Sequence, residues 1–285
     1  MNNWRLVTLS FFVSLNSLCS QGLLDELNED GTDQTYYTEA TFKDTRIVNL
    51  QSNETTPKNV LHFVILHRFG KINSGFYDLF GLDNADMKMS LDYGITDDIT
   101  ISYARNNFQK TFEGSLKAKI LKQSTGYYNM PISISWYSIA MYTNSREFDH
   151  THVQRLSYAH QAIITKKINR NLSVALVPSL VHKNIIDQPY ELHDNFVLGL
   201  GGRYKVKPRV SLNAEYNLRI NPHENDPNYN GLSMGVDIET GGHVFQLHIT
   251  NSKGMFERSF LTENFGTWTN GDIYFGFNLS RVFNL

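Results

Sequence analysis

The chain has 285 residues and a formal net charge of −2, so it lacks the basic excess that marks a nucleic-acid-binding protein. Its 18 phenylalanines and 15 tyrosines suit a soluble β-sandwich, and they suit equally a membrane barrel with aromatic girdles. The mean hydropathy of −0.35 does not exclude a barrel, because barrel strands alternate apolar and polar residues.

The first twenty residues predict a secretory signal peptide. Arg5 precedes an apolar run from Leu6 to about Leu18, and small and polar residues follow it. The run is short for a transmembrane helix, although an N-terminal anchor helix is the alternative. Cleavage near Cys19 to Gln21 would leave a mature chain without cysteine, which cannot be trapped by wrong disulfides in an oxidising compartment. We therefore expect an exported protein.

Residues 21–58 predict a polar N-terminal extension. They are rich in Asp, Glu, Thr and Asn, and they alternate only weakly around TFKDTRIVNL at residues 41–50. We expect this extension to lie in the periplasm or to line the lumen of a barrel, with one short strand at most. A disordered tail is the alternative.

From residue 59 to the end, apolar and polar residues alternate in twelve segments. Most are about nine to thirteen residues long, which suits a tilted strand that crosses a bilayer. No segment in this region has 18 consecutive apolar residues, which argues against a helical membrane span. The twelve candidate strands begin at residues 59, 86, 98, 110, 131, 152, 171, 195, 209, 231, 243 and 271.

The two faces of these segments differ in polarity. From residue 86, one face carries Met87, Met89 and Leu91, and the opposite face carries Lys88, Ser90 and Asp92. Such apolar faces run over six or seven positions, whereas whole sandwich strands average about five or six residues. Long apolar faces therefore favour a membrane barrel over a soluble β-sandwich or soluble barrel, which is the alternative.

The connections alternate in length. Those after even-numbered strands are short, and those after odd-numbered strands are long, except for the short link at residues 107–109. Short turns at one end and long loops at the other are typical of an outer-membrane barrel with both termini in the periplasm. The predicted fold class is an all-β antiparallel transmembrane barrel of about twelve strands over residues 59–285.

The chain ends on the alternating segment GDIYFGFNLSRVFNL, residues 271–285. We expect it to close the barrel against the first strand, because a free edge in lipid would leave backbone groups unpaired. Phe275, Phe277 and Phe283 share one face and are predicted to contact outer-membrane lipid. This terminal pattern also suits recognition by the barrel-assembly machinery, a predicted partner.

Several runs resemble a known family. LHFVILHRFG, LDYGITDDITISYARN, GVDIETGGHVFQLHITNS and GDIYFGFNLSRVF are similar to the membrane-bound β-barrel family called domain of unknown function 5777, found in Bacteroidota. The resemblance covers roughly residues 40–285. It implies a barrel in the outer membrane of a Gram-negative bacterium, and it implies no substrate, reaction, cofactor or catalytic residue.

Charged side chains of both signs are predicted to face the lumen. A wide pore that selects one ion sign would carry a ring of one charge, so mixed signs indicate either a lumen filled by ion pairs or a narrow polar channel. By the parity of the strands, the lumen-facing polar residues are Lys88, Asp92, Glu113, Lys117, Arg155, Arg203, Glu215, Arg219, Asp237, Glu239 and His248.

Small residues gather on the same face of two neighbouring strands. Ser173, Ala175 and Ser179 lie on one, and Gly199 and Gly201 lie on the next. Glycine in a strand allows the sheet to bend or another segment to approach closely. Either the barrel curves here, or a loop or the N-terminal extension packs against this side.

The predicted function is a small pore for polar solutes. The alternative is a non-conducting barrel that anchors periplasmic or surface partners through its extension, and an outer-membrane enzyme is third. No GxSxG or P-loop motif occurs, and His248 in HITNS is predicted to face the lumen rather than the lipid. The ten histidines form no tight cluster with carboxylates, and the mature chain would have no cysteine, so we expect no metal or cofactor site. His150 and His152 share a face near a loop and are the alternative, as half of a surface metal site. Without those catalytic motifs we expect no catalytic site. Substrate, partner and oligomeric state stay open.

Overall fold

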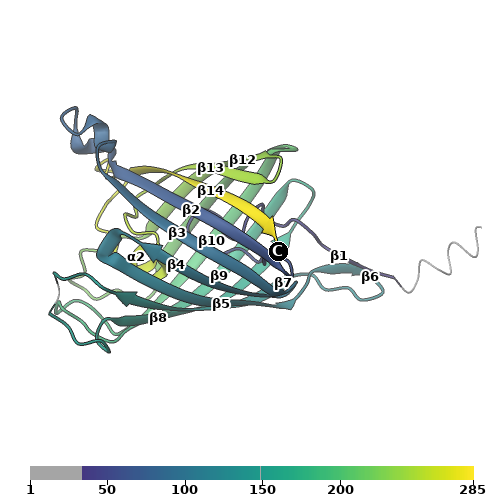
Figure 1. The fold of residues 1–285 in the computed structure, drawn as a ribbon, viewed down its shortest axis with the longest axis horizontal. Helices are drawn as coiled ribbons and strands as arrows, with labels where there is room; N and C mark the ends of the chain where they lie inside the picture. Colours follow the sequence, from purple (N-terminus) through teal and green to yellow (C-terminus); the bar gives the residue numbers. More distant parts are fainter. Residues whose placement is uncertain (1–33, 148) are drawn as a thin grey trace, which may run out of the picture.

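Twelve antiparallel strands close into a barrel in the computed structural model, which describes residues 34–285 except residue 148 (Figure 1). The predicted all-β barrel, its strand number and the pairing of consecutive strands are confirmed. The wall strands are β2 (Val60–Lys71), β3 (Ala85–Thr96), β4 (Ile99–Asn106), β5 (Thr111–Leu121), β7 (Ser133–Thr143), β8 (Leu156–Lys167), β9 (Leu172–Lys183), β10 (Asp194–Lys207), β11 (Val210–Arg219), β12 (Gly231–Thr240), β13 (His243–Thr250) and β14 (Tyr274–Asn284).

The last strand closes the wall against the first. β14 pairs with β2 along its length, from Tyr274 opposite Lys71 to Asn284 opposite Val60, with one irregularity between Tyr274 and Gly276. The ladder leaves neither strand with a free edge, which is the condition for a sheet to stand in lipid. None of the helices in the described part of the chain is long and apolar enough to cross a membrane.

The connections follow the predicted alternation. The short ones, such as residues 97–98 and 241–242, all lie at the end of the barrel that also holds both ends of the wall, and we call it the turn end. The long ones, such as residues 184–193 and 251–273, lie at the loop end. Two connections are exceptions. The link at residues 107–110, which contains the 3₁₀ turn η3 (Phe108–Lys110), is short although it lies at the loop end, and the connection at residues 122–132 is long although it lies at the turn end.

Short elements supplement the wall. β1 (Thr35–Tyr37) and β6 (Ser124–Gly126) form a separate two-stranded sheet that projects from the turn end (Figure 1). One helix, α2 (Glu257–Thr262), lies in the last long connection, and η1 (Ile72–Ser74) and η2 (Leu79–Gly81) lie in the first. The sequence did not predict β1 and β6, because three residues are too few for a period-two signal.

The start of β8 differs most from the prediction. The segment expected to begin at residue 152 becomes β8 only at Leu156. The backbone N–H of Arg155 donates to the carbonyl of Thr151 at 3.1 Å, so this stretch forms a turn instead. The alternation predicted the strand correctly, but it could not separate its first residues from the turn that precedes them.

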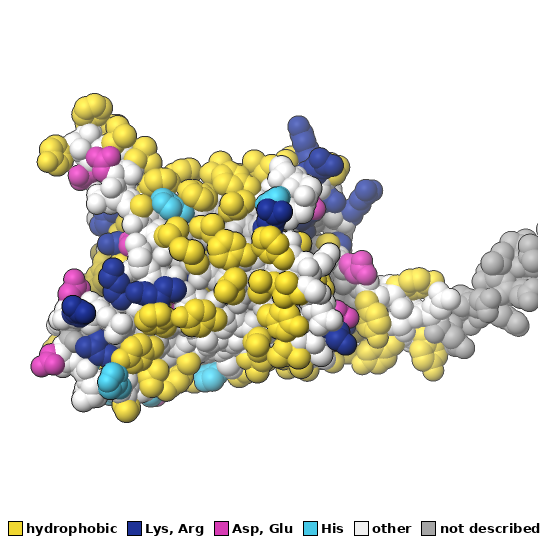
Figure 2. Space-filling view, in the orientation of Figure 1, with side chains coloured by type: hydrophobic (Ala, Val, Ile, Leu, Met, Phe, Trp, Pro, Cys, Tyr) yellow, Lys and Arg dark blue, Asp and Glu magenta, His cyan; other side chains and the backbone are white. Residues whose placement is uncertain are grey.

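Apolar side chains cover the outside of the wall, as Figure 2 shows for one face. The outer surface includes Phe275 and Phe277, whose rings stack on Phe69 at 5.8 Å and on His67 at 4.8 Å between centroids. Phe283 is 39% exposed near the end of β14. Contact of these three phenylalanines with lipid remains a prediction.

Removing β14 should prevent the barrel from forming. Without residues 274–285, β13 and β2 would each present an open edge, at several kcal/mol for each unsatisfied backbone group in lipid. We expect the intact chain in detergent to migrate differently on a gel before and after boiling, and the truncated chain to lose this difference. A variant without residues 34–57 keeps every wall strand and serves as the control. A heat-dependent shift in the truncated chain would contradict the closure.

Candidate functional site

A segment that precedes the wall fills the centre of the barrel. Residues 40–54 enter the lumen and turn back, and we call them the N-terminal hairpin. The N–H of Ile47 donates to the carbonyl of Leu50 at 2.8 Å, and the N–H of Ser52 donates to that of Thr45 at 2.9 Å. Every residue from Ile47 to Asn53 is at most 4% exposed. The described part of the extension, which the sequence placed in the periplasm or lumen, is therefore largely inside the barrel.

The tip of the hairpin binds one buried carboxylate. Glu215, on the inner face of β11, accepts the backbone N–H groups of Val48 at 3.1 Å, Asn49 at 2.9 Å and Leu50 at 2.9 Å. It also accepts the side-chain amide of Asn49 at 2.8 Å. Three successive N–H groups that converge on one anion form a nest, and they satisfy a carboxylate that would otherwise be costly to bury.

The carbonyls of the hairpin are bound by cations and amides of the wall. Lys117 on β5 donates to three of them, those of Thr45 at 2.8 Å, Ser52 at 3.1 Å and Glu54 at 3.3 Å. These bonds replace the ladder that the hairpin lacks, since it pairs with no wall strand over these residues. The other donors are Arg203 to Ala40 and Thr41, both at 3.1 Å, Gln246 to Ile47 at 2.7 Å, and Asn278 to Val48 at 3.3 Å.

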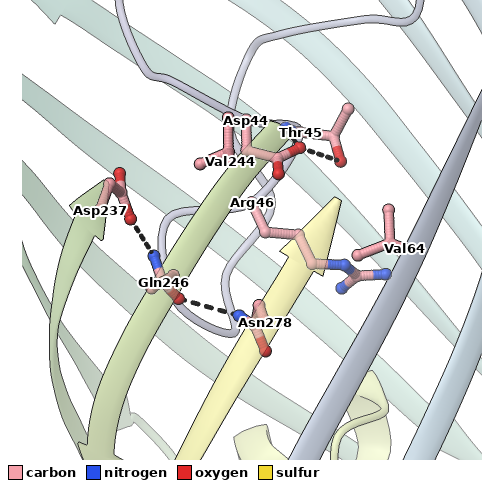
Figure 3. A pocket seen from close by; sticks show the side chains of 8 residues that line it. All are labelled: Asp44, Thr45, Arg46, Val64, Asp237, Val244, Gln246 and Asn278. Carbon is pink, nitrogen blue, oxygen red and sulfur yellow. Dashed lines mark hydrogen bonds between the residues drawn. The ribbon is translucent and has the colours of Figure 1, made fainter. Parts of the chain in front are cut away.

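Amide and carboxyl side chains of the wall are themselves linked beside the hairpin (Figure 3). Gln246 donates to Asp237 at 2.6 Å and accepts from Asn278 at 2.8 Å, so one row of side chains crosses β12, β13 and β14. The side chain of Arg46 extends past this row toward Val64, as Figure 3 shows. The space left between them is only about 10 Å³, roughly what one water molecule needs.

The apolar side of the hairpin packs where the wall has no side chains. A Cβ on Gly201 would lie 2.4 Å from Cδ1 of Ile47, and one on Gly199 would lie 2.9 Å from Cδ1 of Leu50. Of the two interpretations of these small residues, the structure supports close approach of the extension. Wall residues such as Val177 and Val197 complete the same apolar cluster.

A second segment closes the lumen from the loop end. The connection at residues 251–273 folds inward and carries α2, and Phe256, Phe260 and Leu261 are fully buried. They join the apolar cluster of the hairpin and of β7 to β10. Lys88, which pairs with Glu113, also donates to the carbonyl of Met255 at 3.1 Å. We call residues 251–264 the inward loop.

The two closing segments touch each other. Glu257 of the inward loop accepts from Gln51 of the hairpin at 2.9 Å and lies 3.4 Å from the guanidinium of Arg46. Arg68 of β2 bridges both segments, because it donates to Asn49 at 2.7 Å and to the carbonyl of Ser252 at 2.7 Å. The barrel is thus closed by two segments that share hydrogen-bond partners.

Ion pairs fasten the inward loop at the loop end. Glu263 lies 3.2 Å from Arg258 and 3.0 Å from Lys183. Burial alone would raise the pKa of Glu263, but the charges of Arg258 and Lys183 outweigh it and hold this pKa at about 2. The carboxylate is therefore ionised at neutral pH, and both pairs persist there.

The structure places most of the predicted lumen residues inside the barrel. Two lie at its ends: Glu239 contacts Lys43 near the turn end, and Arg155 donates to the carbonyls of Thr143 and Ser145 in a long loop. The other nine are at most 8% exposed: Lys88, Asp92, Glu113, Lys117, Arg203, Glu215, Arg219, Asp237 and His248.

Some of these residues serve other contacts. Asp92 lies 3.6 Å from His62, Arg219 pairs with Asp226 in the loop after β11, and His248 lies 3.3 Å from Arg68. Arg68 was not among the predicted lumen residues, because the inner face of β2 also carries Val64 and Leu66 and so lacks a polar pattern. Among the described residues, no three His, Cys, Asp or Glu side chains are placed to hold a metal ion.

Replacing Glu215 by glutamine should loosen the hairpin. Glutamine has the same size, but it is uncharged and directs N–H donors toward the N–H groups of residues 48–50. Hydrogen bonds to a charged group contribute about 1.5–3 kcal/mol. We expect amide hydrogen exchange at Val48, Asn49 and Leu50 to accelerate about 30-fold or more, as follows from a loss of about 2 kcal/mol. Glu224→Gln, which changes an exposed carboxylate in the loop after β11, is the matched control. Equal protection in both variants would show that the nest does not hold the hairpin.

Filling the space at Gly201 should displace the hairpin. A leucine there would overlap Ile47, and overpacking typically costs about 1–3 kcal/mol. We expect Gly201→Leu to accelerate exchange at the amides of Ile47 and Leu50, and Ile47→Ala in the same chain to restore protection in part. Gly202→Leu is the control, because a Cβ there meets no atom closer than 3.9 Å. The same response at both glycines would rule out this packing.

The comparisons with known proteins agree with this architecture. The NanC porin has 8% identity and a TM-score of 0.50, and the match covers 77% of this chain and 98% of that one. The KdgM porin has 9% identity and a TM-score of 0.50, with 78% and 99% covered. An outer-membrane channel from Pseudomonas putida F1 has 13% identity and a TM-score of 0.49, with 81% and 98% covered. At these identities the likeness concerns the fold alone.

Sequence comparison supplies the family. No curated protein matches the chain. The model of the family described as membrane-bound beta barrel domain (DUF5777) matches residues 42–283, which include most of the hairpin as well as nearly the whole wall. The resemblance read from the sequence is thereby confirmed. This chain belongs to the membrane-bound β-barrel domain family DUF5777, and its fold is that of the outer-membrane porins.

Proposed function

We propose that the protein is an outer-membrane pore for small polar solutes, and that the hairpin and the inward loop hold it closed in this conformation. The observation that carries the proposal is which groups the charged side chains of the lumen bind. Glu215, Lys117 and Arg203 bind the backbone of the hairpin rather than one another. A lumen that is permanently filled needs no such charges, since an apolar core of similar volume is commonly as stable.

Withdrawal of the hairpin would leave a polar passage. Glu215 and Lys117 would lose their partners, and buried charges without partners cost several kcal/mol unless water enters. Water would therefore fill the vacated space. Charges of both signs would line it, so we expect little preference between anions and cations and a preference for polar over apolar solutes.

The hairpin can leave without opening the wall. It is held by side chains of the wall, and the backbone bridge to the wall, between Lys58 and Gly94, comes only after it. At its other end the chain leads out of the turn end to β1, which pairs with β6. A pull on residues 34–40 from that side would draw the hairpin out along the barrel axis.

A non-conducting anchor is the second candidate. The closure of the barrel by two segments favours the anchor. After the hairpin had left, Phe256, Phe260 and Leu261 of the inward loop would still occupy the loop end. In that case the β1–β6 sheet at the turn end would be the docking element for a partner. We propose no catalytic role in either case.

Conductance in a planar bilayer separates the two candidates. We expect the intact chain to be silent, and a variant without residues 34–57 to open briefly, since Glu257 then lacks Arg46 and Gln51. A variant that also replaces residues 254–263 by a short Gly-Ser linker should give steady ohmic steps. Shortening of the inward loop alone is the control and should stay closed, because the hairpin remains. Silence of the double variant, shown to be folded by its gel shift, would refute the pore and favour the anchor.

A further inference from the structure

A cavity of about 280 Å³ lies at the loop end, above the inward loop. Four connections contribute to it: the link after β4, and the long loops after β7, β9 and β13. We call it the loop-end pocket. Its lining includes the side chains of Gln109, Gln154, Gln188, Tyr190, Arg258 and Glu263.

The charges around the loop-end pocket balance. Three cations, Arg155, Lys183 and Arg258, line it together with three anions, Asp187, Glu191 and Glu263. Several of them pair with each other: Glu263 with both Arg258 and Lys183, and Asp187 with His150 at 3.0 Å. A pocket without an excess of either sign does not favour a charged ligand. Its paired ions and amides still offer many hydrogen-bond donors and acceptors.

The remaining lining suits a ring that bears hydroxyl groups. Gln188 offers an amide that can donate and accept, and Gln109 and Gln154 offer their NH₂ groups as donors, since their amide oxygens accept from Arg258 and Thr151. Tyr190 and Phe265 add aromatic rings that can cover an apolar C–H face, and Phe265 is 61% exposed. Amides beside aromatic rings, without net charge, match a solute with polar edges and apolar faces.

We propose that the loop-end pocket binds a small neutral saccharide. This proposal rests on the proposed function, because it names the class of solute that the pore admits. The site is joined to the closure itself: Arg258 lies in α2 and Glu263 directly follows it, and α2 carries the buried Phe260 and Leu261. A sugar that contacts Arg258 or Glu263 better when α2 has moved would shift the inward loop toward the open position.

Binding can be measured without conductance. The probes are glucose, maltose and cellobiose, with glucuronate and alanyl-alanine as charged comparators. Saturation-transfer NMR and calorimetry are performed on the full mature chain in an amine-oxide detergent, because maltoside and glucoside detergents carry sugar headgroups. We expect at least one neutral saccharide to bind, and to bind more tightly than both comparators.

Substitutions locate the site. Tyr190→Ala and Gln188→Ala should weaken binding of the saccharide about threefold to tenfold, the effect of losing one ring contact or hydrogen bond. Neither side chain belongs to the ion pairs that fasten the inward loop. Tyr77→Ala, in the loop after β2 where Tyr77 is 94% exposed, is the matched control and should bind like the unaltered chain.

Three results would overturn the proposal: no binding of any neutral saccharide to folded protein, tighter binding of a comparator, or unchanged affinity in Tyr190→Ala and Gln188→Ala. These results are distinct from failure of the pore. If saccharides bind and the doubly shortened variant stays silent, the pore is refuted and the site is kept as a sugar-binding surface of an anchor. If that variant conducts and no saccharide binds, only the present proposal fails.

Discussion

The buried backbone of the N-terminal hairpin is the constraint on which the rest of the interior depends. A chain that enters a barrel without joining its wall brings polar N–H and C=O groups that no ladder can satisfy. Here Glu215 accepts three N–H groups at the tip, and Lys117 donates to three carbonyls along the arms. The polar inner face of the wall therefore binds the hairpin. The buried charges of Glu215 and Lys117 are explained by the backbone groups to which they are hydrogen-bonded.

The wall could be predicted from the sequence because the features that determine it involve residues close together in the chain. Alternation fixes which residues share a face, and the lengths of the connections fix which strand ends lie together. The position of Glu215 inside the barrel follows from this parity. The partner of Glu215 does not follow from it. Parity shows that the side chain points into the lumen, but it does not show what fills the lumen. The hairpin gave only a weak signal because side chains, rather than a neighbouring strand, satisfy its backbone.

Two features of the interior were within reach of the sequence, and one was not. Gly199 and Gly201 signalled a close approach, although curvature of the wall explained them equally well before Ile47 and Leu50 were seen against them. The last connection carries Phe256, Phe260, Phe265 and Trp268, a pattern that fits an inward fold as well as an extracellular contact. The contact of Arg46 and Gln51 with Glu257 was not within reach, because it joins residues about two hundred positions apart and no pattern along the chain predicts it.

The positions of Glu215 and Lys117 also have a mechanical consequence. In the closed order of twelve strands, six strands lie between β11 and β5 on one side and four on the other, so the two strands stand on nearly opposite walls. Because the hairpin is hydrogen-bonded to both, it acts as a cross-brace that resists flattening of the barrel under the lateral pressure of a bilayer. A barrel that has released its hairpin would be softer in cross-section, and its shape would depend more on the lipid around it.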